Sequence, residues 1–516
     1  METLHYLGAG LLHIFGPEDF AMLLLGLLIG MAVSIMPGLG LIMGVVLALP
    51  FTYRMSLEPS IILLTAIYVS GTYAGCFTAI LYRIPGEPMD VPLLWDGYSM
   101  TRKGQAAKAL GWALVAALAG GLISSAVMVA LAVPLSHAAL SFGPPEYFAA
   151  VLFGFTAIAA LAGNSFVNAL ISLLIGLLIA TVGVDGTYSS LRFTFGSPVL
   201  MSGLPYVVIL VGMYGLGELL SRLGQGLPAV DRPAKDSAVS TAFPTLRETW
   251  ALRATFLRSS ILGTILGIVP GAGATITSFI SYGIEKQYGR RRAQLGEGIP
   301  EGIIAPQIGS TASVAGHMIP LLTLGLPGSG ATAVILGAFL LHGVQPGPLL
   351  FETPGSKLIV YTILASLFVS VIGMCVMGYF WIKVVVKVLA IPQAVLVSIV
   401  IVFCVVGAYA NRNSMSDVWI IVCFGILGYL FERFKFPIAP MVLGAILGPL
   451  AETSLIQSMV SYNNDWTVFF RHPISAVLIV LAIVALAYPL IRDTILRRSQ
   501  IGSYLMSEAP ETAVEA

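Results

Sequence analysis

Long apolar runs, each about twenty residues or more, recur along nearly the whole of this chain. An α-helix needs about twenty apolar residues to cross the roughly 30 Å of hydrocarbon in a bilayer. The composition agrees, because 57% of the residues are hydrophobic and only 10% are charged, against roughly 25% charged in soluble domains. The runs are continuous, whereas the strands of an outer-membrane barrel alternate in polarity over about ten residues. The sequence therefore predicts an all-α fold, a polytopic membrane helical bundle.

The apolar runs predict roughly 10–13 membrane elements when each crossing takes about twenty residues. They lie at 20–51, 60–82, 108–135, 147–183, 199–221, 254–283, 303–343, 358–411, 416–450 and 473–491. The longest polar stretch between them is too short to fold alone, so we expect it to be a linker. The expected division is a first membrane repeat at 1–221, a cytoplasmic linker at 222–253, a second membrane repeat with following helices at 254–450, and a C-terminal helix with a polar tail at 451–516.

Two kinds of Pro-Gly break occur in the same order in each half of the chain. The first kind is Pro-Gly-x-Gly, at 37–40 and at 270–273, and each copy lies seven residues after a glycine, Gly30 or Gly263. The second kind is a shorter Pro-Gly break, at 85–86 in the first half and at 327–328 in the second. Two breaks per half, repeated in order, predict an internal duplication.

Loop charges predict how the two repeats are oriented, because cytoplasmic loops accumulate Lys and Arg. Segments 102–108, 222–253 and 284–293 are basic, whereas their counterparts 52–59 and 344–357 hold only Arg54 and Lys357. We therefore expect inverted repeats. Segment 254–283 would then begin and end on the cytoplasmic side, so its Pro-Gly break predicts a re-entrant hairpin. Segment 20–51 would form the matching hairpin from the outside.

The breaks are the candidate substrate site. Pro lacks a backbone N–H and Gly tolerates unusual backbone angles, so helices end and restart at these motifs. Backbone polar groups freed at membrane depth are tolerated when they line a polar cavity, and a helix that restarts there presents a partial positive charge to an anion. The alternative is a set of helix kinks packed against neighbours. The predicted substrate-binding residues are Pro37, Gly38, Gly40, Arg83, Pro85, Gly86, Pro270, Gly271, Gly273, Ser310, Thr311, Pro327 and Gly328.

Neutral oxygen and amide groups near the second-half breaks are the candidate coupling-ion ligands, since they suit Na⁺. They are Thr275, Ser278, Gln307 and Ser313. His317 would carry a coupling proton or fill a structural role. Arg83 would bind a carboxylate or extend to the membrane interface. Glu87, Asp90 and Asp96 are expected to be solvated loop residues.

Several functions are excluded or disfavoured by the sequence. There is no G-x-x-x-x-G-K-[ST] motif for ATP hydrolysis, and H-E-x-x-H and G-x-S-x-G are also absent. A net charge of +1 does not indicate the strongly basic surface that binds nucleic acid. The four cysteines lack metal spacing, so we expect them to pack in apolar helices. No catalytic residue, metal site or cofactor is predicted beyond Na⁺ or H⁺ as coupling ion. A multipass membrane enzyme and a passive anion channel are the alternatives to transport.

The sequence resembles the large membrane subunit of the tripartite tricarboxylate transporters, the TctA family, along nearly its whole length. The matching stretches lie at 37–40, 84–88, 96–98, 104–105, 109–111, 269–273, 301–302, 305–306, 319–328 and 342–348. This resemblance implies a permease of the bacterial inner membrane that takes up organic carboxylates by cation symport. It also implies two partners, a small membrane subunit (TctB-like) and a periplasmic solute-binding protein (TctC-like).

The chain departs from the family pattern near the candidate site. Gln307, Ser310 and Thr311 stand where the family usually has Glu-x-x-Asn-Asn, and Arg83 stands where it usually has Asn. An extra Arg and fewer amides would suit an organic anion other than a tricarboxylate, so the expected cargo is a tricarboxylate or a related organic acid. We also expect no cleaved signal peptide, because the first Lys or Arg is Arg54.

Overall fold

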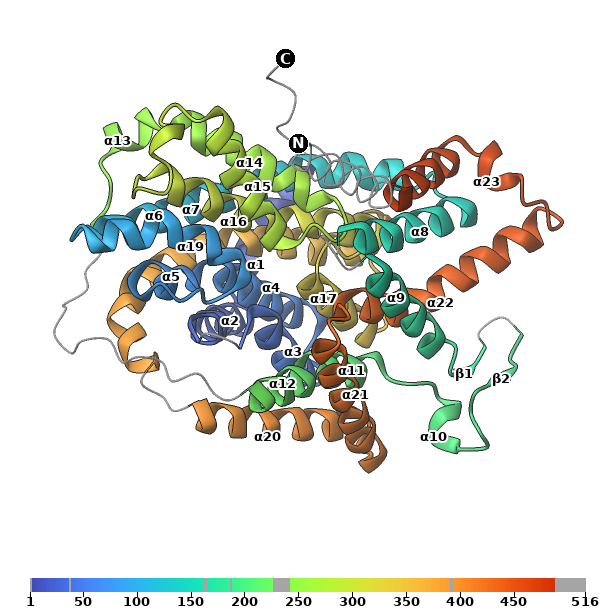
Figure 1. Ribbon diagram of the computed structural model, residues 1–516. Coiled ribbons are helices and arrows are strands. Elements are labelled where there is room, and N and C mark those ends of the chain that lie inside the picture. The colour runs from blue at the N-terminus through green and yellow to red at the C-terminus, as the bar shows by residue number, and fades with distance from the viewer. Residues whose placement is uncertain are drawn as a thin grey trace, which may run out of the picture.

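The computed structural model describes residues 2–36, 39–161, 166–185, 188–225, 242–389 and 393–487. These residues are mostly helical (Figure 1). The helices of the first half are α1 (Glu2–Ile14), α2 (Pro17–Ile35), α3 (Leu41–Thr52), α4 (Leu57–Ala74), α5 (Cys76–Tyr82), η1 (Pro88–Asp90), α6 (Val91–Arg102), α7 (Ala106–Ala139), α8 (Pro144–Leu161), α9 (Phe166–Ala180), α10 (Pro198–Met201), α11 (Tyr206–Leu210), η3 (Val211–Leu216) and α12 (Gly217–Gln225).

The second half continues in the same way. Its helices are α13 (Leu246–Ala251), α14 (Arg253–Ile268), α15 (Gly273–Tyr288), η4 (Arg292–Gln294), α16 (Glu301–Leu324), α17 (Gly330–Leu341), α18 (Leu349–Glu352), α19 (Pro354–Leu389), α20 (Gln393–Arg412), α21 (Met415–Arg433), α22 (Ile438–Ser461), α23 (Val468–Arg471) and a last helix at Pro473–Ala487. The all-α prediction misses one small feature. Strands β1 (Gly183–Val184) and β2 (Leu191–Arg192) pair antiparallel, because the loop between α9 and α10 folds back on itself.

Six helices are long and apolar enough to cross a membrane, so the chain is an integral membrane protein. They are Pro17–Ile35, Leu57–Tyr82, Ala106–Ala139, Gly355–Trp381, Met415–Arg433 and Ile438–Ser461. Seven further apolar helices among the described residues are shorter, at 10–17 residues each. Two of the shorter ones, Leu41–Thr52 and Gly330–Leu341, begin just after a Pro-Gly break, because such a motif interrupts what would otherwise be a full-length crossing.

Helices α2 and α3 fold back on each other against α4. Gly26 and Gly30 of α2 lie against the α4 backbone near Leu63 and Ile67, so α2 runs in the same direction as α4. Helix α3 returns along α4, since its Gly44 faces Ile67 and the Thr52 carbonyl at its end accepts a 3.4 Å hydrogen bond from Ser60. Small residues permit this close approach of helices in a membrane protein. The open end of this hairpin, where α2 starts and α3 ends, therefore lies beside the start of α4.

Helices α14 and α15 make the same arrangement against α16. Gly263 and Gly267 of α14 lie against the α16 backbone near Gly309 and Ser313. The start of α14 and the end of α15 lie together, because Thr255 donates to the Glu285 carboxylate at 3.2 Å. This second hairpin opens toward the start of α16. In Figure 1, α14 and α15 lie at the top of the view and α2 and α3 lie below them.

The starts of α4 and α16 lie at opposite ends of this core. The start of α4 contacts the end of α17, where a His342 ring nitrogen lies 3.0 Å from the Met55 carbonyl oxygen. The start of α16 contacts α6, where Asp96 accepts a 3.0 Å hydrogen bond from the Ile299 N–H. The two helices meet partway, since Gln307 donates to the Thr72 carbonyl at 3.2 Å. The two hairpins thus open toward opposite ends.

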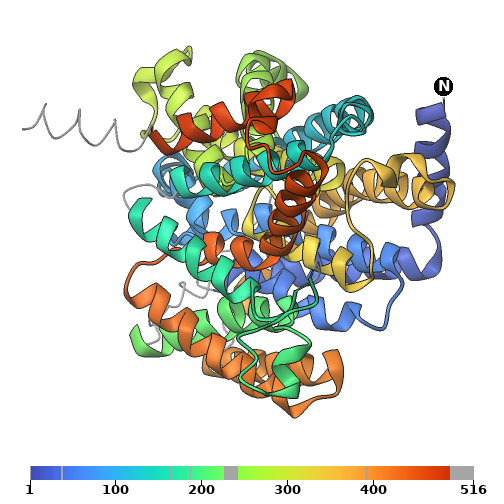
Figure 2. The same ribbon diagram turned by 90° about the vertical axis from the view of Figure 1, so that its right-hand side faces the viewer.

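Two segments lie at the edges of the molecule. Helix α1 stands at one edge (Figure 2) and packs on α19, where the rings of Tyr6 and Tyr361 stack 5.5 Å apart. Part of the predicted linker docks on the start of α7, since Lys108 donates to Glu248 of α13 at 2.6 Å. This hydrogen bond and those from Thr245 lower the pKa of the Glu248 carboxyl to about 2. Residues 226–241 of the linker and 488–516 of the predicted tail lie outside the described part of the chain.

Candidate functional site

A cavity of about 330 Å³ lies where the chain breaks meet. Its size falls at the lower end of the range for small-molecule sites, roughly 300–1,000 Å³. All four break regions contribute to its wall. The lining residues are Leu41 and Ile42 after the first break, Glu87, Pro88 and Met89 at the second, 271–276 at the third and 328–331 at the fourth, together with Tyr68, Ile158, Pro437, Ala439, Pro440 and Leu443.

Three helices begin at this cavity. The first residues of α3, α15 and α17 are Leu41, Gly273 and Gly330, and all three line it. The first four N–H groups of a helix lack partners within the helix, and the aligned peptide dipoles add about half a positive charge there. Three such ends around one small cavity make it suited to a negatively charged ligand.

The third and fourth breaks are joined directly. The Gly271 N–H donates to the Gly328 carbonyl at 2.9 Å. Gly271 has φ +87°, which favours glycine, and a Cβ there would lie 2.6 Å from the Ile158 Cα. A Cβ on Gly328 would lie 3.0 Å from the His317 Cα. Both positions therefore need glycine because neighbouring backbone comes too close for a side chain.

A carboxylate from the second break lies at the start of α3. The Leu41 N–H donates to Glu87, and Glu87 itself is only 9% exposed. A second carboxylate, Glu218 of α12, also approaches, because a Cβ on Gly40 would lie 3.8 Å from one of its oxygens. The positive end of α3 therefore already holds a carboxylate of the chain. This carboxylate also lines the cavity.

The expectation that Glu87, Asp90 and Asp96 are solvated loop residues is wrong. All three are buried. Asp90 accepts the Glu87 N–H at 2.8 Å, while Asp96 accepts N–H groups of the loop before α16. The position of Glu87 held a signal, because a carboxylate directly after a break between apolar runs has little room to reach water.

A hydrogen-bonded chain leads from the cavity into the core. The Tyr68 hydroxyl lies 2.7 Å from His317 Nδ1 and 3.1 Å from the Ser329 hydroxyl. Ser329 caps α17 and accepts the Thr332 N–H at 3.3 Å. His317 is fully buried, and its Nε2 has no hydrogen-bond partner among the described residues. His317 therefore does not line the cavity but is linked to it through Tyr68.

The structure brings only some of the predicted site residues to the cavity wall. Gly271, Gly273, Gly328 and Thr275 line it. Pro37 and Gly38 lie outside the described residues. The remaining predicted residues do not line the cavity, namely Gly40, Arg83, Pro85, Gly86, Pro270, Pro327, Ser278, Gln307, Ser310, Thr311 and Ser313. Gly40, Pro85, Gly86, Pro270 and Pro327 are chain neighbours of lining residues, or lie within two residues of one.

Arg83 does not line the cavity. It ends α5 in a left-handed conformation, with φ +58°, and it is exposed. Its guanidinium lies 5.8 Å above the ring of Tyr98, within the range of a cation–π contact. The predicted contact between Arg83 and a substrate carboxylate is therefore not one that this cavity provides.

The polar residues of α16 hydrogen-bond within their own helix. Ser310 and Thr311 donate to the Gln307 carbonyl at 3.0 and 2.9 Å, and Ser313 donates to the Ser310 carbonyl at 2.7 Å. Such back-bonding satisfies hydroxyls in buried helices. Ser278 of α15 donates to the Met89 carbonyl at 2.7 Å and so ties α15 to the second break. In this conformation the hydroxyls of these residues are satisfied within the protein and do not line the cavity.

Comparisons with known proteins identify a family model and related proteins that match this chain. The model of the tripartite tricarboxylate transporter TctA family matches residues 20–443. The chain is 33% identical over 501 residues to an uncharacterized 52.8 kDa protein in the TAR-I ttuC′ 3′ region of Agrobacterium vitis, covering 97% of this chain and 99% of that protein. It is 35% identical over 239 residues to an uncharacterized protein in the TAR-II ttuC′ 3′ region of the same organism, covering 46% of this chain and 98% of that protein. No solved structure matches the chain.

Proposed function

Because this chain belongs to the tripartite tricarboxylate transporter TctA family, we propose that it forms the substrate-translocating permease subunit of a binding-protein-dependent secondary transporter. The proposed cargo is a tricarboxylate or a related organic acid, which enters by symport with a cation. The proposed location is the bacterial inner membrane. The single observation that carries this proposal is the cavity lined by the starts of α3, α15 and α17, since three positive helix ends suit a carboxylate cargo.

Two partners complete the proposed system. A periplasmic solute-binding protein, TctC-like, would deliver the acid to the outer face, and a small membrane subunit, TctB-like, would join the permease in the bilayer. Both follow from family membership. A delivery protein distinguishes this proposal from a passive anion channel, which would need neither delivery nor a gradient.

Inverted repeats would explain how the site opens to each side in turn. The contacts that support them are the two hairpins, α2–α3 and α14–α15, which open toward opposite ends of α4 and α16. The charges support the same arrangement, because the basic segments 102–108 and 284–293 both lie at the end where α16 starts. Movement of one repeat against the other around the breaks would alternate access to the cavity.

Coupling would act through Glu87. The Glu87 carboxylate at the start of α3 repels an anionic cargo. It also accepts the hydrogen bond from the Leu41 N–H, which is a donor that the cargo would use. A Na⁺ ion or a proton bound there removes this repulsion, so cargo and cation favour each other's binding. Of the four predicted coupling ligands, Thr275 lines the same cavity. Ser278, Gln307 and Ser313 would then position the helices that carry the site.

Changing Glu87 to Gln is expected to separate coupling from transport. The amide keeps the shape of the side chain but carries no charge, so it mimics the neutralised carboxylate. Gradient-driven accumulation should fall at least about tenfold, while exchange of labelled for unlabelled cargo continues. Exchange and accumulation would be measured in the same proteoliposomes, with exposed Glu432→Gln as the matched control. Accumulation at the wild-type level by Glu87→Gln would contradict the assignment.

The proposed function itself is tested by uptake into proteoliposomes that contain all three subunits. Radiolabelled di- and tricarboxylates would be offered with Na⁺ and proton gradients imposed separately. We expect one acid to accumulate against its gradient, and to stop doing so when the binding protein is left out. Uptake that only equilibrates the acid and ignores both gradients would favour the passive channel instead.

A further inference from the structure

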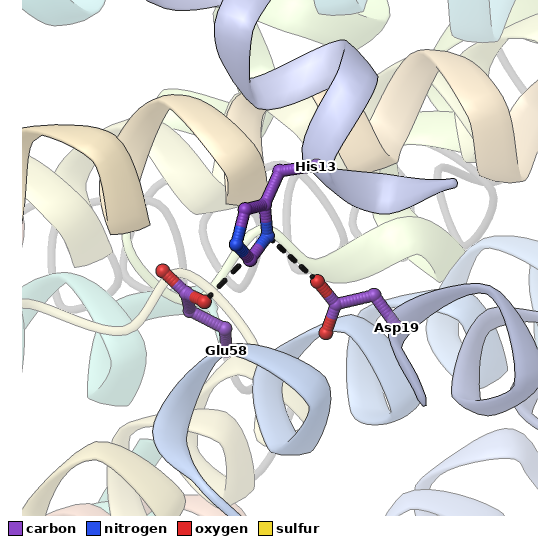
Figure 3. Close-up of side chains that lie close together, drawn as sticks. All are labelled: His13, Asp19 and Glu58. Atoms are coloured by element: carbon purple, nitrogen blue, oxygen red, sulfur yellow. Dashed lines mark hydrogen bonds and ion pairs between the residues drawn. The ribbon is translucent and has the colours of Figure 1, made fainter. Parts of the chain in front are cut away.

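Three side chains of types that bind metals meet at the open end of the first hairpin, and none of them lines the cavity (Figure 3). His13 Nδ1 lies 2.9 Å from an oxygen of Asp19 and 3.8 Å from an oxygen of Glu58. One ligand atom from each residue lies within 4.8 Å of the other two. Figure 3 shows the imidazole placed between the two carboxylates.

Each residue comes from the end of a different helix. His13 lies in the last turn of α1, Asp19 in the first turn of α2, and Glu58 in the first turn of α4. Asp19 and Glu58 come together because α2 and α4 run side by side in the same direction from this end. Helix α1 packs mainly on α19, so the cluster is one of its few contacts with the hairpin.

The charges of the cluster do not balance. Asp19 is only 5% exposed, and a buried carboxylate is costly unless it is paired. Among the described residues, His13 is the basic group that lies within ion-pair distance of Asp19 and of Glu58. Even a protonated imidazole therefore leaves one negative charge in excess. A divalent cation would remove that excess and would contact all three residues at once.

We propose that His13, Asp19 and Glu58 bind a divalent first-row metal ion, with Zn²⁺ as the ligand that fits best. One imidazole nitrogen and two carboxylate oxygens form a set of three protein ligands that Zn²⁺ accepts with water at its fourth position. In a tetrahedral site two ligand atoms on one Zn²⁺ lie about 3.3–3.6 Å apart, since each bond is about 2.0–2.2 Å. The two separations from His13, 2.9 and 3.8 Å, lie on either side of that spacing. The ion would fasten α1 to the starts of α2 and α4, on the face where we propose that cargo arrives.

The proposal is tested by metal binding to the full-length purified chain, carrying no polyhistidine tag. After dialysis against a low Zn²⁺ concentration, wild type should retain about one Zn²⁺ per chain. His13→Asn and Asp19→Asn should each lower the affinity at least about 100-fold. His472→Asn is the matched control, because His472 lies 2.8 Å from the Glu146 carboxylate and that pair has no third ligand among the described residues.

Co²⁺ provides a second readout that does not depend on counting ions. Co²⁺ in the proposed site should give visible absorption bands in wild type and in His472→Asn, and these bands should be absent in His13→Asn. If His13→Asn fails to fold, Glu58→Gln tests the same site from another helix. The proposal would be overturned if wild type retained no Zn²⁺, or if His13→Asn bound Zn²⁺ with unchanged affinity. The three side chains would then form only an ion pair between His13 and the two carboxylates. Neither result would touch the proposed transport function, which is measured by uptake.

Discussion

Changing Gly271 or Gly328 to valine is expected to abolish uptake while the protein still inserts into the membrane. At Gly271 a β-branched side chain would have to adopt φ +87°, and its Cβ would lie 2.6 Å from the Ile158 backbone. Forcing such a backbone conformation costs about 1–3 kcal/mol before the overlap is counted. At Gly328 the Cβ would meet the His317 backbone at 3.0 Å. Each change therefore displaces the hydrogen bond that joins the third and fourth breaks.

The measurement is initial uptake rate, divided by the amount of protein in the membrane. Gly283→Val is the matched control, because Gly283 lies in α15 and a Cβ there meets no atom within 4 Å. We expect uptake by Gly271→Val and Gly328→Val to fall to background, and uptake by Gly283→Val to stay within about twofold of wild type. Normal uptake in both test variants would mean that the breaks do not form the site.

Changing Asp96 to Ala should cause the largest loss of stability in this chain. The Asp96 carboxylate is fully buried and accepts N–H groups from Gly296, Gly298 and Ile299 at 2.8–3.0 Å. It also accepts the Tyr282 hydroxyl at 3.0 Å. Removing a buried charged partner leaves these donors unsatisfied and costs about 3–5 kcal/mol. Because the contact joins α6 of the first half to the loop before α16, its loss should loosen the two halves from each other.

The measurement is thermal unfolding of the detergent-solubilised chain, with size-exclusion chromatography to detect loss of the folded species. Glu297→Ala serves as the control, since Glu297 lies in the same loop and is exposed. We expect its midpoint to match wild type, whereas Asp96→Ala should unfold at a clearly lower temperature or fail to remain monodisperse. Equal midpoints for the two variants would show that the hydrogen bonds to Asp96 contribute little.

The main features of this protein follow from local sequence. Apolar run length requires membrane helices, and Pro without an N–H must interrupt them, so the positions of the breaks are readable without a structure. The prediction of an integral membrane protein is confirmed by the six long apolar helices, and the TctA resemblance is confirmed by the family match. The predicted starts of helices after the breaks agree with α3, α15 and α17. Inverted repeats stay a proposal.

The positions of the side chains around the site depend on contacts between segments that lie far apart in the sequence. Asp96 and Ile299 lie 203 positions apart, and nothing near Asp96 in the sequence indicates that a loop of the other half covers it. Glu87 was missed for the same reason, since the helix start that binds it lies 46 positions earlier. Arg83 was expected at the cavity because it adjoins a break, yet the left-handed turn at the end of α5 directs it toward Tyr98.

By itself, then, the sequence determined where helices must span, stop and restart, because these properties depend on runs of neighbouring residues and on the backbone chemistry of Pro and Gly. Only the tertiary structure decided which of those restarts share one cavity and which polar groups face it. That choice depends on which face of each helix packs against which partner, and Ser310, Thr311 and Ser313 show the consequence. Their composition suggested ligands, but close packing of α16 turned their hydroxyls onto its own carbonyls.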